Sequence, residues 1–89
     1  MSASVVSAEI SGECVALVDG QAQAMISVFD RGLQYGDGLF ETLRCEQGRV
    51  CWFDRHLARL SAGCARLGLP EPDGAVLRRE AEECLAKSP

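Results

Sequence analysis

Few residues in this sequence combine the type and the spacing that catalysis requires. The chain has one histidine, His56, and one lysine, Lys87, which stands near the end on a predicted helix tail. No serine, histidine and aspartate are spaced as a nucleophilic triad, and the glycine-rich stretch at residues 32–38 is neither a Walker loop nor a dinucleotide-binding motif. We therefore assign no catalytic residue within these 89 residues and interpret Lys87 as a solvated surface charge.

Five cysteines are another possible source of chemistry, and their spacing argues against it. Their number is odd, and neither a CxxC pair nor a metal-ligand spacing is present, which disfavours a disulfide framework and a metal site. No base is placed to activate any of them as a thiolate. We expect them to be reduced and mostly buried: Cys14, Cys45, Cys51, Cys64 and Cys84.

Arg59 can be considered either as a binding residue or as an ordinary surface arginine. A guanidinium is a planar fork of donors that matches phosphate oxygens. At the border of an apolar helix stripe its stem can rest on the core while its head enters a cleft. The alternative is a surface arginine on a basic helix face shared with Arg55 and Arg66. The residues alone leave both interpretations open.

The elements that must position Arg59 begin with short strands. Residues 14–18 are an apolar run closed by Asp19-Gly20, a dipeptide that readily forms a tight hairpin turn. Residues 24–29 are a second candidate strand. Residues 30–38 then supply three glycines, which predicts a loop with special backbone angles.

A hairpin and a helix follow this loop. Residues 39–45 and 49–53 flank Glu46-Gln47-Gly48, which has the length and the glycine of a three-residue connection. Asp54 is predicted to cap a helix over residues 55–67 by accepting backbone N–H bonds. The apolar stripe of this helix, which can pack on the sheet, consists of Leu57, Leu60, Cys64 and Leu67.

A second helix is predicted from near Asp73, so the strands precede the helices along the chain. This order predicts an α+β fold in which helices cover one face of a small antiparallel sheet, as one domain spanning residues 1–89. Apolar residues make up 47% and charged residues 25% of the chain, which suits one small core. The net charge of −4 argues against nucleic acid or an anionic membrane as partner.

Two segments together resemble the N-terminal signature of fold-type-IV pyridoxal-phosphate enzymes. They are DRGLQYGDGLFETLR at residues 30–44 and GRVCWFDRHLARL at residues 48–60. The resemblance covers about residues 18–70. This family includes branched-chain aminotransferases, D-amino acid aminotransferases and aminodeoxychorismate lyases. The YGDGLFETLR, RHLARL and GLP segments are most similar to the lyases.

The resemblance implies roles for individual residues. The arginine of the family's HxxRL motif binds the phosphate of pyridoxal 5'-phosphate, which corresponds to Arg59 here. Tyr35 and Phe40 match positions that line the substrate side of the pocket, where packing beneath the glycine loop is the alternative. His56 is expected to orient Arg59 or to satisfy a strand carbonyl. Neither Glu41 nor Thr42 receives a catalytic role.

The family's reaction also needs a lysine far downstream of HxxRL, on a second domain that is absent from these 89 residues. The resemblance therefore implies that the complete enzyme, a homodimer, converts 4-amino-4-deoxychorismate to p-aminobenzoate and pyruvate for folate synthesis. We expect this chain alone to be inactive. The alternatives are a branched-chain or D-amino acid aminotransferase of the same fold, or a stand-alone non-catalytic interaction domain. Neither a signal peptide nor a membrane span is recognisable, so we expect a cytoplasmic protein.

Overall fold

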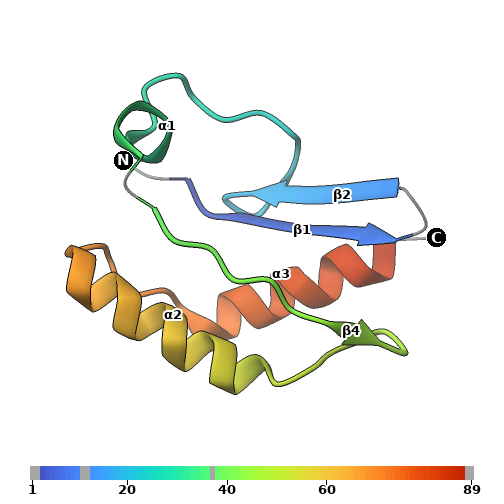
Figure 1. The fold of residues 1–89 in the computed structure, drawn as a ribbon. Coiled ribbons are helices and arrows are strands. Elements are labelled where there is room, and N and C mark those ends of the chain that lie inside the picture. The colour runs from blue at the N-terminus through green and yellow to red at the C-terminus, as the bar shows by residue number, and fades with distance from the viewer. Residues whose placement is uncertain (1–2, 11–12, 37, 88–89) are drawn as a thin grey trace.

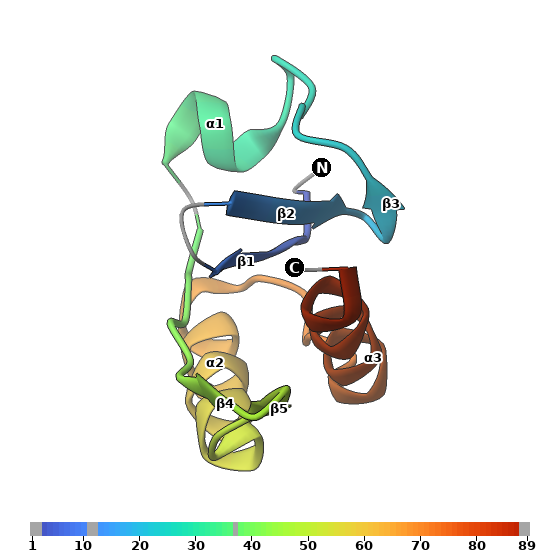
Figure 2. The same cartoon turned by 90° about the vertical axis from the view of Figure 1, so that its right-hand side faces the viewer.

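The computed structural model describes residues 3–10, 13–36 and 38–87, which form two small antiparallel sheets and three helices (Figure 1). A three-stranded sheet lies over α2 and α3, and α1 lies on the opposite side of that sheet (Figure 2). The predicted α+β class is therefore confirmed. The elements are β1 (Val5–Ile10), β2 (Glu13–Val18), β3 (Gln21–Ala22), α1 (Arg31–Tyr35), β4 (Cys45–Glu46), β5 (Arg49–Val50), α2 (Phe53–Leu67) and α3 (Gly74–Lys87).

The three-stranded sheet is built on two antiparallel pairings in the order β1-β2-β3. β2 confirms the strand predicted at residues 14–18, and its turn to β3 is the predicted Asp19-Gly20 pair, with φ angles of 51° and 81°. Positive φ at both central residues gives the turn a twist that matches its strands. β1 was not predicted, although Val5, Val6 and Ile10 are of types enriched in strands, and it is held by six paired positions on β2 and by contacts with α3.

The strand predicted at residues 24–29 is wrong. β3 ends at Ala22, and the following residues join no ladder in the described structure. Their apolar side chains are exposed: Met25, Ile26, Val28 and Phe29. Strand propensity reflects packing on a pleated, half-buried surface, and this segment has no such surface beside it.

The glycine-rich loop contains a short helix, α1, which the sequence did not predict. Asp30 caps it, since its carboxylate accepts a hydrogen bond from the Leu33 amide at 3.2 Å. Gly36 ends it in the left-handed region at φ 72°, which confirms the special backbone angle expected there. Asp37, in the same predicted loop, lies outside the described residues.

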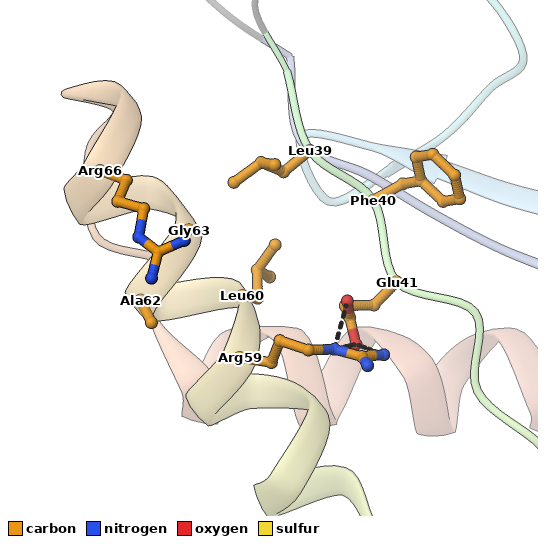
Figure 3. Close-up of a pocket in the computed structure, with 8 residues that line it drawn as sticks. All are labelled: Leu39, Phe40, Glu41, Arg59, Leu60, Ala62, Gly63 and Arg66. Atoms are coloured by element: carbon orange, nitrogen blue, oxygen red, sulfur yellow. Dashed lines mark hydrogen bonds and ion pairs between the residues drawn. The ribbon is translucent and has the colours of Figure 1, made fainter.

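The hairpin before α2 is shorter and tighter than predicted. Glu46 pairs directly with Arg49, so the connection has two residues, Gln47-Gly48, with φ angles of 52° and 74°. Glutamine is not typical at a left-handed position, which is why the sequence favoured a three-residue connection. Residues 39–44 are not paired as a strand, and they approach α2 as an extended segment (Figure 3).

The two long helices occupy nearly the predicted residues, but Leu67, which was expected on the inward stripe of α2, is 54% exposed. α2 begins at Phe53, and its N-cap is Trp52 at φ 53° without a side-chain cap, so the prediction of Asp54 as N-cap is wrong. Asp54 lies in the first turn, where a negative charge favours the helix dipole, and accepts a 2.8 Å hydrogen bond from Arg78 of α3. α3 begins at Gly74, beside Asp73 as predicted, and Asp73 Oδ1 accepts hydrogen bonds from the amides of residues 75 and 76.

The core lies between the three-stranded sheet and the helices. Its buried apolar side chains are Leu17, Val18, Phe53, Cys64 and Cys84. All five cysteines are free, as expected, but Cys14 and Cys45 are exposed and Cys51 is half-buried, so the prediction of mostly buried cysteines is wrong. Cys14 and Cys45 lie on β2 and β4, and Cys51 lies in the turn that follows β5.

Candidate functional site

Arg59 of α2 makes a two-pronged ion pair with Glu41 on the extended segment that precedes the hairpin. Its Nε donates to both carboxylate oxygens at 3.1 Å, and its Nη2 donates to Oε1 at 2.8 Å. Figure 3 shows Glu41 and Leu39 pointing toward α2 and the Phe40 ring turned away from it. The period of two along an extended chain gives this alternation. Glu41 thereby fixes the direction of the arginine fork.

His56 shares the same carboxylate. Its Nδ1 lies 2.7 Å from Glu41 Oε1, and it stands one helical turn before Arg59. The side chains of Glu41 and His56 are 14% and 22% exposed, while that of Arg59 is 70% exposed. His56 therefore contacts Glu41, the residue that holds Arg59. The alternative expected from the sequence was a hydrogen bond to a strand carbonyl, and His56 makes no such bond to the residues that the structure describes.

Glu41 is the site residue that the sequence did not single out. The sequence could have identified Glu41 by its charge, because it is the only acidic residue between positions 38 and 45. Hydrogen bonds from Arg59, and then from His56, hold the pKa of Glu41 below its ordinary value of 4.5. The carboxylate is therefore ionised at neutral pH, as the ion pair requires.

Replacement of Glu41 by glutamine should remove a pH-dependent part of the stability. A carboxyl group with a lowered pKa stabilises the fold above its ordinary pKa, and the stabilisation is lost as the pH falls through the folded-state value. The difference in unfolding free energy between wild type and Glu41→Gln should therefore be largest near pH 6–7 and shrink below about pH 4.5. Urea unfolding between pH 3 and pH 7 measures it. Glu82→Gln, at an exposed position of α3, is the control, and a difference that stays constant with pH would contradict the role of Glu41.

The Arg59 guanidinium keeps one edge available after binding Glu41. Glu41 engages the edge formed by Nε and Nη2. A guanidinium has five N–H donors, and its end-on edge, formed by Nη1 and Nη2, can bind a second anion in the same bidentate way. The Arg59 guanidinium makes no other hydrogen bond to residues 3–10, 13–36 and 38–87. The site can therefore hold an oxyanion at an arginine that is already oriented.

An open pocket of about 260 Å³ lies beside this arginine. Its wall is apolar on the side of Leu39 and Leu60 and small at Ala62 and Gly63, and it carries positive charge from Arg59 and Arg66 (Figure 3). A second hollow is lined by Trp52, Arg55, His56 and Arg59. Arg59 therefore lines two concave surfaces.

The other predicted binding residues occupy different places. Phe40 borders the pocket and is 86% exposed. Tyr35 ends α1, is 73% exposed and does not line either hollow. Arg55 and Arg66 are exposed; Arg55 lines the second hollow and Arg66 lines the first.

Within the part of the chain that the structure describes, no three His, Cys, Asp or Glu side chains gather as metal ligands. Across the same residues, no helix combines the length and the apolar character needed to cross a bilayer.

Curated proteins match parts of the chain. A bifunctional aminodeoxychorismate lyase/D-amino acid transaminase from Mycobacterium tuberculosis is 47% identical over 53% of this chain and 16% of its own length. An aminodeoxychorismate lyase from Vibrio harveyi is 36% identical over 63% of this chain and 21% of its own length. A D-alanine aminotransferase from Bacillus licheniformis is 35% identical over 55% of this chain and 17% of its own length. The chain thus spans about a fifth or less of these relatives, and no solved structure matches it significantly.

A family model gives the broader assignment. The model of amino-transferase class IV matches residues 38–89, which is more than half of the chain. The matched segment contains Glu41, His56, Arg59 and the whole of α2 and α3. Members of this family are pyridoxal-phosphate enzymes. The chain belongs to the amino-transferase class IV family.

Proposed function

We propose that this chain is the N-terminal, cofactor-phosphate-binding part of an aminodeoxychorismate lyase, in which Arg59 binds the phosphate of pyridoxal 5'-phosphate. The observation that carries the proposal is the orientation of Arg59. Its inner edge is bound by Glu41, its outer edge is available, and its side chain is 70% exposed beside a pocket. A pre-oriented guanidinium loses less conformational freedom when it binds a phosphate.

The donor set of this site fits a phosphate ester. The end-on edge of Arg59 offers parallel N–H donors, and the adjoining wall of Leu39 and Leu60 suits the apolar part of an aromatic ligand. When bound, the pyridine ring supplies an electron sink for carbanion chemistry. The residues of this chain bind and orient: Arg59 holds the phosphate, and Glu41 holds Arg59.

The lyase assignment rests on sequence likeness. The YGDGLFETLR, RHLARL and GLP segments support it, as do the relatives whose names include aminodeoxychorismate lyase. Under the proposal, the complete protein converts 4-amino-4-deoxychorismate to p-aminobenzoate and pyruvate. A D-amino acid aminotransferase is the second candidate, because other relatives carry that activity in their names.

The exposed apolar side chains at residues 25–40 suit burial in a homodimer, which sedimentation of the complete protein would test.

The test compares two reactions of one purified complete protein. The proposal expects release of p-aminobenzoate from 4-amino-4-deoxychorismate, without a need for a keto acid acceptor. Transfer of the amino group from a D-amino acid to a keto acid, with no p-aminobenzoate release, would favour the aminotransferase. Absence of both reactions, together with no binding of pyridoxal phosphate, would favour the alternative of a non-catalytic interaction domain.

A further inference from the structure

One carboxylate oxygen joins His56 to Arg59. His56 Nδ1 lies 2.7 Å and Arg59 Nη2 lies 2.8 Å from the same Oε1 of Glu41. The two nitrogens are therefore well within the Debye length of about 8 Å at physiological ionic strength, so a charge on one is felt at the other. An ionised carboxylate only accepts hydrogen bonds, so the contact requires a proton on Nδ1. Nε2 is then the atom at which the neutral imidazole takes up a second proton.

Nε2 of His56 is open to solvent. It makes no hydrogen bond to the described residues, and among them Glu80 Oε1 is the only buried side-chain nitrogen or oxygen that lacks a partner. His56 lines the second hollow beside Arg55 and Arg59. Within the described residues, no acidic side chain lines that hollow, and no charged side chain of β4, β5 or α3 does so. The charged groups around the imidazole are thus Glu41 from the extended segment and the two arginines from its own helix.

The net charge of this cluster depends on the protonation of His56. With a neutral imidazole, the charges of Glu41 and Arg59 cancel, whereas an imidazolium leaves one net positive charge and shares the carboxylate between two cations. Histidine is the side chain that ordinarily changes charge between pH 5 and pH 8. Arg59 is 70% exposed, so water weakens the effect of the added charge on an anion at its outer edge.

We infer that His56 makes anion binding at Arg59 depend on pH, with the affinity rising when Nε2 takes up a proton. His56 is a positioning residue in this role, because its contact is with Glu41. The inference rests on the proposed function in taking Arg59 as the residue that binds phosphate. It concerns the same anion at the same edge of Arg59, so no second ligand competes for the site.

Inorganic sulfate tests the inference, because it remains a dianion throughout this pH range, whereas a phosphate ester itself titrates near about pH 6. In an NMR titration of the 89-residue chain at constant ionic strength, wild type should bind sulfate about two- to fivefold more tightly at pH 5 than at pH 8. His56→Asn should bind it equally at both pH values, since the amide can donate to Glu41 but takes up no proton. Arg79→Ala, at an exposed position of α3, should keep the wild-type ratio.

The His56 ring signal gives a second readout that does not need a variant at this position. His56 is the only histidine of the chain, so its signal is unambiguous. Coupling between two binding events is reciprocal, so sulfate should move the midpoint of the His56 titration to higher pH. This movement should disappear in Arg59→Ala, where the anion is no longer held beside Glu41.

Three outcomes would overturn the inference. They are a wild-type sulfate affinity that is the same at pH 5 and pH 8, a His56→Asn variant that keeps the wild-type pH dependence, and a movement of the His56 midpoint that persists in Arg59→Ala. Failure of the proposed function is separately visible as unchanged binding of pyridoxal phosphate by Arg59→Ala in the complete protein. That result leaves the comparison of wild type with His56→Asn standing.

Discussion

Arg59→Ala in the complete enzyme should weaken pyridoxal phosphate binding by about ten- to a hundredfold, because a charge-assisted pair with phosphate is lost. The fold should remain intact, since the Arg59 head is exposed and Glu41 keeps its contact with His56. Arg59→Lys should give an intermediate affinity, because an ammonium keeps the charge but lacks the planar fork. Cofactor titration followed by absorbance measures all three affinities.

The control for this experiment must lie away from both hollows. Arg55 and Arg66, on the same face of α2, are unsuitable because each lines one of them. Arg79 is exposed on α3 and lines neither hollow, so Arg79→Ala should leave cofactor affinity unchanged. Tight cofactor binding by Arg59→Ala, with weakened binding by Arg79→Ala, would show that the phosphate site lies elsewhere.

Glu80→Met should raise the free energy of unfolding by about 1–3 kcal/mol, which is the usual cost of a buried polar group without a partner. Glu80 is only 6% exposed, and its Oε1 is buried with no hydrogen-bond partner among the described residues. Methionine is unbranched and has a helix propensity similar to that of glutamate, so the comparison isolates the polar group. Glu80→Gln should have a smaller effect, since the amide is also polar.

Urea unfolding of the chain measures the effect of Glu80. The matched control is Glu83→Met, one turn further along α3 at an exposed position, where the same change should alter stability by less than about 0.5 kcal/mol. A loss of stability in Glu80→Met would mean that this carboxylate has a partner whose contribution exceeds the cost of burying it.

Local residue chemistry explains what could be predicted from the sequence. Asp19-Gly20 was identified as a turn because both residue types accept positive φ, and the end of α2 was identified because glycine follows its last apolar residue. The helical period placed Arg59 on the border of the α2 stripe, where its head is exposed. These features depend on a few neighbouring residues only.

Tertiary contacts explain what could not be predicted. The Glu41 pairing arises because an extended segment crosses α2 at Arg59, and no local pattern encodes that approach. The left-handed Trp52 displaced the expected Asp54 cap, and the segment at residues 24–29 has strand-forming side chains but no neighbouring strand to pair with. Glu80 is likewise polar on a helix face that packing buries.

The left-handed residue that starts α2 gives the chain a built-in optical probe. Trp52 is its only tryptophan, is 67% exposed, and lines the second hollow together with His56 and Arg59. Its fluorescence therefore originates from one known place at the edge of the site. A chromophoric ligand held at Arg59 would quench that emission by energy transfer, so binding can be followed in the unmodified chain without an attached dye.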